Sequence, residues 1–367
     1  VENVDILIRG ISTTGNNSPL ILIDGVERSG GLASLDNNEV DSVPVLKAAA
    51  ATGVFGVRGA NGVILITTKR GEPGKADINI SAEHSIQTVI YRSTLKLNSW
   101  EHAELVNLRN ANDGIEPKYS DWQIEQFKNG SDPVFFPNRD PWNELIKPGH
   151  QTKANINVSG GTKDVQYFVN ASYLHQGSIF KTQSADVLGY DPSFSLNRFN
   201  IRTNIDSKIS PSLKASLNVS GYVNSTNLIP WEDGMEWKDP DFSHPWVNLT
   251  VMGGIARTTP ATPGPTIPAN TYDNNGNLLQ EGGWVRERYQ YYARMNYAGY
   301  IKQTSSVMNS NLALDWDMKS ILPGLSSRAM VAYDINAMGW LKASAVYKTF
   351  NYYLQTSETD KQSYFYE

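Results

Sequence analysis

Hydrophobic and polar positions divide the chain into two parts with different periods. In residues 1–71, short apolar runs bounded by turn residues predict four strands, at Asp5 to Arg9, Leu20 to Asp24, Val43 to Lys47 and Val63 to Lys69. The runs ILI and ILIT lack strict alternation, which indicates strands covered on both faces. This part therefore predicts a compact α+β unit and not a barrel wall.

The stretch 58–71, RGANGVILITTKRG, has two interpretations: a loop that cradles a phosphate, or turn residues that feed a strand. Neither the Walker pattern nor the dinucleotide-binding pattern is present. The helix-like segment 48–57 precedes the glycines, so Gly59 and Gly62 close a helix and lead into the strand. No helix N-terminus faces the loop, and we predict a helix, a turn and a buried strand.

After a Gly-rich linker at 70–76, the pattern from residue 77 onward alternates with a period of two. In 198–206 one face carries Phe199, Ile201, Thr203 and Ile205, and the other carries Arg198, Asn200, Arg202, Asn204 and Asp206. Similar alternation occurs in 154–158, 165–173, 213–219 and 311–318. Strands of about 9–11 residues cross a bilayer when tilted.

The connections between these strands are regularly unequal. Three are short, at 159–164, 210–212 and 320–327, and three are long, at 92–152, 175–197 and 225 to about 303. Short turns on one side and long loops on the other are typical of a transmembrane β-barrel. If all short turns share one side, the aromatic stretch 289–301 lies in the long loop or extends the next strand, and is not a separate crossing.

Composition and charge agree with this picture. The 367 residues carry a net charge of −5 with scattered Lys and Arg, which gives no indication of a nucleic-acid partner. The chain has no cysteine, so it has neither a disulfide framework nor a Cys-based zinc site. The mean hydropathy of −0.39 is typical of a soluble protein, but it does not exclude a membrane barrel, whose lipid-facing and lumen-facing residues average out.

Two stretches carry a family resemblance. LIRGISTTGNNSPLILIDGV, followed by DSVPVLKAAAATGVFGVRGANGVILITTKRG, closely resembles the plug signature of SusC/RagA-type TonB-dependent outer-membrane transporters of Bacteroidetes. The stretches NVSGGTKDVQYFVNASYLHQGSIF and FNIRTNIDSKISPSLKASLNVSG resemble the first barrel strands of that family. One departure is Pro44, where the family has an acidic residue, so we expect the edge of that plug strand to differ.

The resemblance implies a mainly β fold, a partial transmembrane antiparallel barrel with an α+β plug in its lumen. It divides the chain into the C-terminal part of a plug (1–71), a linker (72–76) and the first barrel strands with their extracellular loops (77–367). The barrels of this class have roughly 22 strands, against about seven expected here. We expect the chain to belong to a longer protein, with the TonB box and most of the barrel outside it.

The resemblance also implies function and partners. It suggests import of glycan or peptide oligomers across the outer membrane of a Gram-negative, Bacteroidetes-type bacterium, with no catalysis and no cofactor. The implied partners are a SusD-like surface lipoprotein that forms a lid, the TonB-ExbB-ExbD complex that supplies energy, outer-membrane lipid and the oligomeric substrate.

Two sets of candidate site residues remain open. Arg9, Asp24 and Arg58 end plug strands, and they form either ion pairs that hold the plug in the barrel or solvated strand ends. Four tryptophans in the longest loop could stack on sugar rings or contact a peptide, or could pack the loop against itself or a partner. They are Trp231, Trp237, Trp246 and Trp284.

Catalytic and metal-binding readings find little support. The five histidines lack a metal-ligand spacing, and no G-x-S-x-G is present. The segment Asp273 to Gly276 resembles a calcium loop, but Thr271 and Gly282 stand where acidic ligands are required. We interpret the histidines as scattered surface residues and the segment as a turn, and predict no metal site.

Two functions of different classes therefore compete. The first is the TonB-dependent importer, and the second is a secreted or surface β-rich module for adhesion or glycan binding. A barrel exposes the apolar faces of its strands to lipid, whereas a soluble module buries them between sheets. The plug-like residues 1–71 favour the importer.

Overall fold

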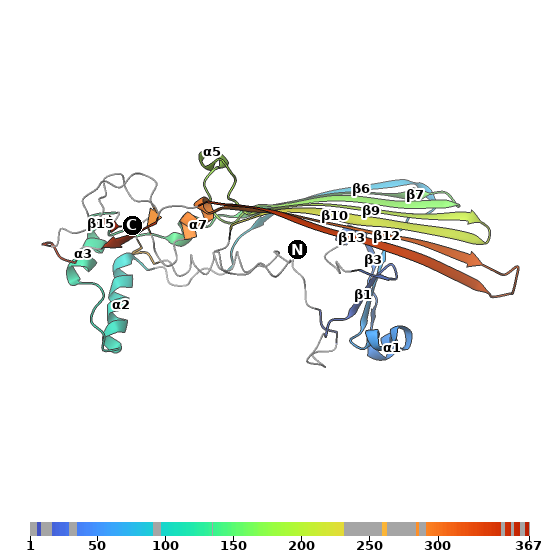
Figure 1. Ribbon diagram of the computed structural model, residues 1–367, viewed down its shortest axis with the longest axis horizontal. Coiled ribbons are helices and arrows are strands. Elements are labelled where there is room, and N and C mark those ends of the chain that lie inside the picture. Colours follow the sequence, from blue (N-terminus) through green and yellow to red (C-terminus); the bar gives the residue numbers. More distant parts are fainter. Residues whose placement is uncertain are drawn as a thin grey trace.

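The computed structural model describes residues 6–8, 17–28, 35–90, 97–133, 135–230, 259–262, 284–285, 291–345, 349–353, 356–359 and 364–366. They form a small mixed sheet, a seven-stranded antiparallel sheet and a three-stranded sheet. In Figure 1 the small sheet, with β1, β3 and α1, lies below one face of the long strands, and most helices gather beyond one end of them.

The small sheet and its helix form the unit that we call the plug. Its elements are β1 (Leu20–Ile23), β2 (Val26–Glu27), η2 (Asn37–Glu39), β3 (Val40–Ser42), β4 (Val45–Leu46), α1 (Ala48–Phe55), η3 (Gly56–Gly59) and β5 (Val63–Thr68). β1 runs parallel to β5, and the other strands pair antiparallel. Asp24 and Gly25 form the two-residue turn from β1 to β2, both with positive φ, as a tight hairpin requires.

The strands predicted at 20–24 and 63–69 and the helix predicted at 48–57 are confirmed. The strand predicted at 43–47 is confirmed only at Val45–Leu46, because the strand breaks at Pro44, which has no N–H to donate. The strand predicted at 5–9 is wrong in its described part. Residues 6–8 are not a strand, and Ile6 and Ile8 instead pack their side chains on an apolar cluster of the plug.

Both faces of the central plug strands are covered, as their uninterrupted apolar runs predicted. On one face Leu22, Ala51 and Val63 form a buried cluster with α1. On the other face a second buried cluster consists of Ile23, Ile64 and Ile66. The plug thus has apolar cores of its own.

The structure of the turn after α1 decides between the two interpretations of the glycines in 58–71, a phosphate-binding loop or turn residues. Gly62 has φ of +92°, and a Cβ there would lie 2.8 Å from Ile8 Cδ1 and 3.2 Å from the Leu46 carbonyl oxygen. Only glycine fits this backbone and this space. Gly62 is therefore a turn residue that leads into β5, as predicted.

The seven-stranded sheet is the part that we call the wall. Its strands are β6 (Gly74–Gln87), β7 (Gly149–Gly161), β8 (Val165–Gln176), β9 (Ser195–Ser210), β10 (Leu213–Leu228), β12 (Gly299–Asp317) and β13 (Ser326–Ser344). They pair in chain order, with β6 and β13 at the two edges, so the sheet is open and contains the expected seven strands. β6 begins at Gly74, inside the predicted linker.

The predicted alternation of connections is confirmed. Short turns join β7 to β8, β9 to β10 and β12 to β13 at one end of the wall, which we call the turn end. The long connections lie at the opposite end, which we call the loop end (Figure 1). In the described part of the aromatic stretch 289–301, residues 291–297 form α7 (Tyr291–Tyr297) and residues 299–301 begin β12, so this part is not a separate crossing.

The two faces of the wall differ as the period-two pattern predicted. One row of register partners across all seven strands is Ile80, Ile156, Ala171, Ile201, Gly221, Met308 and Ile335. The neighbouring row on the opposite face is Asn79, Asn157, Asn170, Arg202, Ser220, Asn309 and Asp334. We call the first the outer face and the second, which faces the plug, the inner face.

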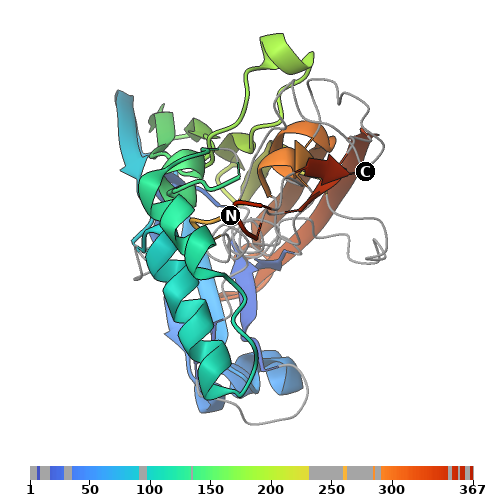
Figure 2. The same ribbon diagram turned by 90° about the vertical axis from the view of Figure 1, so that its left-hand side faces the viewer.

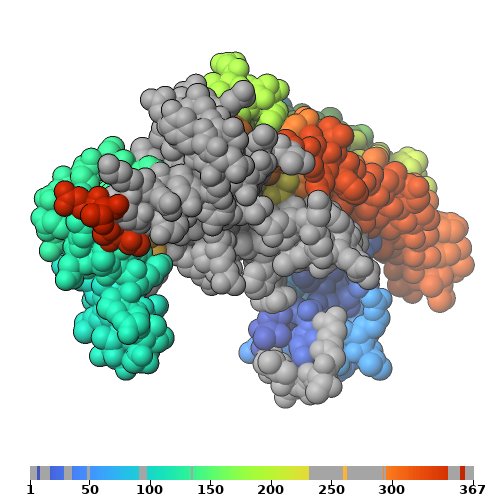
Figure 3. Space-filling model, turned by 60° about the vertical axis from the view of Figure 1, so that its left-hand side comes forward, coloured from blue at the N-terminus to red at the C-terminus, as the bar shows by residue number. Residues whose placement is uncertain are grey.

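Beyond the loop end, the long connections and the segment after β13 build structure of their own. The elements are α2 (Ser99–Asn112), α3 (Asp121–Asn129), α4 (Pro141–Leu145), α5 (Ala185–Leu188), and a small sheet of β11 (Trp284–Val285), β14 (Thr349–Tyr353) and β15 (Tyr364–Tyr366). α2 and α3 share a buried cluster that includes Phe127 and Phe136. Figure 2 shows α2 and α3 in front, seen from the loop end, and Figure 3 shows them as a lobe apart from the blue plug. None of the helices in the described ranges has the length and apolar character needed to cross a bilayer.

Candidate functional site: the polar interface between plug and wall

The inner face of the wall is polar and buried, and it holds the plug. On β9, Arg202 is 3% exposed and Asn200 is 5% exposed, whereas the outer-face neighbour Ile201 is 46% exposed. Buried polar groups and charges are tolerated only when they are hydrogen-bonded or paired. Asn200 has its partners on the wall itself, in Arg198 and Ser172, whereas those of Arg202 come from the plug.

Arg202 is the centre of this interface. Its Nε donates to Glu39 Oε2 of the plug at 2.8 Å, and both side chains are at most 3% exposed. The second Glu39 oxygen accepts from Asn170 Nδ2 on β8 at 3.0 Å. Arg202 Nη1 also lies 3.8 Å from Asp24 Oδ2. One wall guanidinium thus binds two plug carboxylates.

The short η2 turn supplies two carboxylates to the wall. Asp36 caps the turn by accepting from the Asn38 backbone N–H at 2.9 Å, and Glu39 accepts from the Asp36 backbone N–H, which together form a capping box. The other Asp36 oxygen accepts from the Ser172 hydroxyl at 3.0 Å and lies 3.3 Å from Lys153 Nζ. A local capping motif therefore positions both side chains toward β7, β8 and β9.

The end of β5 forms a second group of contacts. The Asp24 carboxylate accepts from the backbone N–H and the hydroxyl of Thr68, at 3.0 and 2.7 Å. Asn204 Nδ2 on β9 donates to the Thr68 hydroxyl oxygen and to the Lys69 carbonyl, at 2.8 and 2.7 Å. Arg70 then donates to Asp206 of β9 at 3.0 Å. These contacts fix the point at which the chain leaves the plug.

A third contact joins the plug to the far edge of the wall. Arg28, which directly follows β2, pairs with Asp334 on β13 and donates to Asn311 Oδ1 on β12 at 3.0 Å. Arg28 is buried, so this pair is largely removed from water. Together the three groups connect the plug to five of the seven wall strands, which are β7, β8, β9, β12 and β13.

The predicted ion-pair residues have different surroundings. Asp24 lies against Arg202 and Arg70, as described above. Arg58 pairs with Glu27 of the plug itself, and both side chains are largely exposed. Arg9 lies outside the described residues. A role of this set in holding the plug remains a prediction.

Of the predicted tryptophans, Trp284 lies in β11, which pairs parallel with β14. Trp231, Trp237 and Trp246 lie outside the described residues, as does the segment from Asp273 to Gly276. Their roles remain predictions.

Sequence reasoning missed several residues on both sides of the plug–wall interface. The missed residues are Arg28, Asp36, Glu39, Lys153 and Asp334. One usable signal was present, since Asp36 and Glu39 have the capping-box spacing D-x-x-E before a strand. The sequence pattern correctly placed Arg202 and Asp206 on the polar face of β9, but it did not identify their partners.

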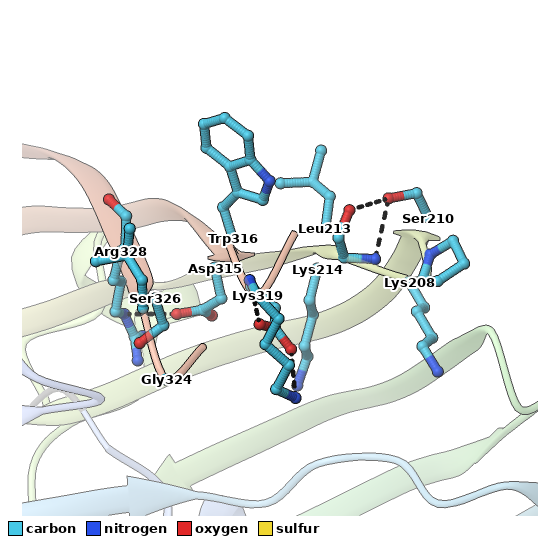
Figure 4. A pocket seen from close by; sticks show the side chains of 15 residues that line it. Lys208, Ser210, Leu213, Lys214, Asp315, Trp316, Lys319, Gly324, Ser326 and Arg328 are labelled. Atoms are coloured by element: carbon cyan, nitrogen blue, oxygen red, sulfur yellow. Dashed lines mark hydrogen bonds and ion pairs between the residues drawn. The ribbon is translucent and has the colours of Figure 1, made fainter. Parts of the chain in front are cut away.

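A cavity of about 450 Å³ lies at the turn end, between the β9–β10 and β12–β13 turns. Figure 4 shows Trp316 and Leu213 projecting to one side of the strands, and Lys208, Lys214 and Lys319 to the other. Lys214, Lys319 and Arg328 each face a carboxylate, of Asp206, Asp317 and Asp315 respectively. The cavity therefore has little free charge for a ligand, and we assign it no binding role.

Gly71 lies in the segment between β5 and β6, which we call the tether, and it has no space for a side chain. A Cβ on Gly71 would lie 2.3 Å from the Tyr167 carbonyl oxygen and 2.6 Å from the Gly160 carbonyl oxygen. We expect Gly71→Ala to push the tether off the wall and to destabilise the plug–wall contact by about 1–3 kcal/mol. Limited proteolysis of the plug in detergent measures this, with Gly74→Ala, where a Cβ meets nothing within 4 Å, as the control. Equal protease sensitivity of the two variants would contradict the expectation.

The Asp36 contact predicts a pH dependence. Burial raises the pKa of Asp36, but the Asn38 N–H, Lys153 and the Ser172 hydroxyl together outweigh it and hold the pKa below its ordinary value of 3.8. Because the folded-state pKa is the lower one, the contribution of Asp36 to stability is complete above pH 3.8 and is lost as the pH falls through the folded-state value.

We therefore expect hydrogen exchange at η2 to show the same protection difference between the wild-type protein and Asp36→Asn at pH 7 and at pH 5, and a shrinking difference only below pH 3.8. A difference that already shrinks between pH 7 and pH 5 would show that another group controls the contact.

These features define the class of protein. A plug with its own cores, held by buried polar contacts on the inner face of a wall whose outer face is apolar and exposed, is the arrangement of a plugged transmembrane β-barrel. A soluble module would bury the outer face, but Phe199 and Ile201 are about half exposed, at 48% and 46%.

Comparisons with known proteins agree. Residues 2–63 match the sequence model of the TonB-dependent Receptor Plug Domain. A TonB-dependent receptor of Formosa agariphila is 28% identical over 224 residues, which cover 59% of this chain and 20% of that protein. The TonB-dependent receptor SusC of Bacteroides thetaiotaomicron is 27% identical over 194 residues, which cover 48% of this chain and 17% of SusC.

Solved structures share the fold. The structure of the RagAB peptide transporter matches with a TM-score of 0.65 at 20% identity, over 92% of this chain and 37% of that chain. The RagAB peptide importer in its closed-closed state matches with a TM-score of 0.62 at 20% identity, over 89% of this chain and 35% of that chain. The resemblance is thus confirmed: the chain is similar in sequence to TonB-dependent receptors that include SusC, shares the fold of the RagAB structures, and spans about a fifth of the length of the curated relatives.

Proposed function

We propose that this chain forms the plug and the adjoining wall of a TonB-dependent importer in the outer membrane of a Gram-negative, Bacteroidetes-type bacterium. The observation that carries the proposal is the polar character of the plug–wall interface. Because the plug keeps two apolar clusters of its own, moving it from the wall exposes charged and amide groups, which water solvates, and not an apolar core.

The same interface explains how the plug stays closed at rest. Removing one partner of a buried ion pair costs about 3–5 kcal/mol, because the other charge is left buried and unpaired. When plug and wall separate, both partners regain water, so the net cost per pair is much smaller. The contacts of Arg202, Arg28 and Arg70 therefore hold the plug against thermal motion but yield to a directed pull. The TonB-ExbB-ExbD complex would supply that pull.

The loop end would receive the substrate. Its helices and small sheet form a structured platform, on which we place a SusD-like surface lipoprotein as the lid. The Asn- and Ser-rich inner face and the loop tryptophans suit oligomers of sugars or amino acids, which combine many hydrogen-bonding groups with stacking surfaces. We propose glycan or peptide oligomers as the cargo, without chemical change of the substrate.

Uptake by cells tests the proposal. A strain lacking the full-length gene would receive labelled oligopeptides and labelled oligosaccharides, with and without the complementing gene, in backgrounds with and without TonB. We expect the complementing gene to restore uptake of one cargo class only when TonB is present, and a surface lipoprotein to copurify in detergent. A protein that is secreted, needs no detergent and restores no uptake would favour the binding module instead.

A further inference from the structure

Two histidines that are far apart in the sequence meet on the outer face of the wall. His84 lies on β6 and His150 at the start of β7, 66 residues later. His84 Nε2 lies 3.2 Å from His150 Nδ1, and the two rings are stacked with centroids 5.4 Å apart. The register places both residues on the face of Ile80 and Ile156, near the loop end. Both residues are exposed.

A neighbouring hydroxyl lies against the second nitrogen of the His84 ring. His84 Nδ1 lies 3.0 Å from the hydroxyl oxygen of Thr152, its register partner on β7. When Nδ1–H donates to this oxygen, the lone pair of the neutral imidazole is on Nε2, the atom that faces His150. Metal-binding histidines generally have their second ring nitrogen fixed by such a partner.

We propose that His84 and His150 form a binding site for a divalent transition-metal ion such as Cu²⁺, Ni²⁺ or Zn²⁺. Bonds of about 2.0–2.1 Å to a tetrahedral ion place two ligand nitrogens roughly 3.3–3.4 Å apart. The observed 3.2 Å is close to this, so both nitrogens can bind one ion once the rings turn to direct their lone pairs at it. Water would complete the coordination.

The donor set selects the class of metal. Imidazole nitrogens suit copper, nickel and zinc, whereas calcium and magnesium require oxygen ligands. The chain has no cysteine, and the described residues contain no group of three or more His, Cys, Asp and Glu that could hold a metal. The site therefore has two protein ligands, which gives moderate and pH-dependent affinity, since protonated imidazole does not bind.

Such an ion would join two wall strands. β6 is the strand that follows the plug tether, and β7 is its antiparallel neighbour. A metal that binds only the paired strands stabilises their pairing by mass action. The site would thus stabilise β6 on β7 at the loop end, independently of cargo and of transport.

Metal titration of the full-length protein, purified in detergent without a histidine tag, tests the site. We expect calorimetry with Cu²⁺ and with Ni²⁺ to show one saturable site per chain, and the Cu²⁺ electron paramagnetic resonance spectrum to show nitrogen ligation. We expect His84→Asn and His150→Asn each to weaken binding by about tenfold or more, and Thr152→Val to weaken it less.

His175→Asn is the matched control. His175 also lies on the outer face near the loop end, as the register partner of Thr152, but its Nδ1 is within 2.9 Å of Asn197 Oδ1. This variant should leave the affinity unchanged. Absence of saturable binding by the wild-type protein, unchanged affinity in either ligand variant, or an equal loss in His175→Asn would each overturn the proposal. Because the readout is metal binding, none of these outcomes bears on import.

Discussion

Replacement of Arg202 by alanine is expected to loosen the plug more than the removal of any exposed charge. Arg202 is 3% exposed and pairs with Glu39, which is equally buried, so the variant leaves a carboxylate without its counter-charge inside the protein. The cost of breaking such a pair from one side is about 3–5 kcal/mol. Since 1.4 kcal/mol corresponds to a factor of ten, plug amides that exchange by local opening should exchange about 100- to 4,000-fold faster.

Arg58→Ala is the control for this experiment. Arg58 also pairs with a plug carboxylate, Glu27, but the two side chains are 67% and 48% exposed. Exposed pairs contribute about 0–1 kcal/mol, so exchange should change by less than about fivefold. Hydrogen exchange of β5 amides in detergent, followed by mass spectrometry, compares the two variants. Equal effects of Arg202→Ala and Arg58→Ala would remove Arg202 from the centre of the interface.

Combining Glu39→Gln with Arg202→Ala separates the effect of the unpaired charge from the effect of the lost side-chain packing. In Glu39→Gln the unpaired charge is on Arg202, which still has Asp24 at 3.8 Å. We expect Glu39→Gln together with Arg202→Ala to be less destabilising than the sum of the two single variants, because the double variant leaves no unpaired Glu39 charge. Strict additivity would show that the two side chains act through separate contacts.

The sequence allowed prediction of the wall, because its signal is local. The period of two over 198–206 predicts which residues share a face of the strand. The alternation of short and long connections predicts which strand ends lie on the same side of the sheet. These two facts were sufficient to place Arg202 and Ile201 on opposite faces and to exclude a separate crossing at 289–301. Only local geometry was required.

The partners across the interface could not be predicted, because they depend on how two units dock. Arg202 and Glu39 are 163 residues apart, and Arg28 and Asp334 are 306 residues apart. No local pattern relates such positions. The same limit applies to His84 and His150. They lie on two different strands, and a search for ligand spacing within one segment of sequence cannot detect such a pair. The break at Pro44 is a different case, because the strand was predicted through this residue although proline has no N–H for the ladder.

A charge placed on the outer face tests the membrane location most directly. Ile201 lies in the row that runs across all seven strands, and we expect Ile201→Arg to destabilise the assembled protein by about 2–4 kcal/mol, as for a basic residue near the middle of a bilayer. The matched site is Ser225 on β10. It lies on the same face, four residues beyond Gly221, the register partner of Ile201.

Four residues along a strand correspond to about 14 Å, which places Ser225 toward the loop end and the membrane interface. There the cost of a basic residue falls to about 0–1 kcal/mol, so Ser225→Arg should assemble almost normally. The fraction of protein that is folded in outer membranes, measured by its heat-dependent mobility in gels, gives the comparison. If both variants assembled equally well, the outer face at Ile201 would not contact hydrocarbon. If only Ile201→Arg lowers the folded fraction, the polarity around the outer face must change along the strand. A bilayer has this property and bulk water does not.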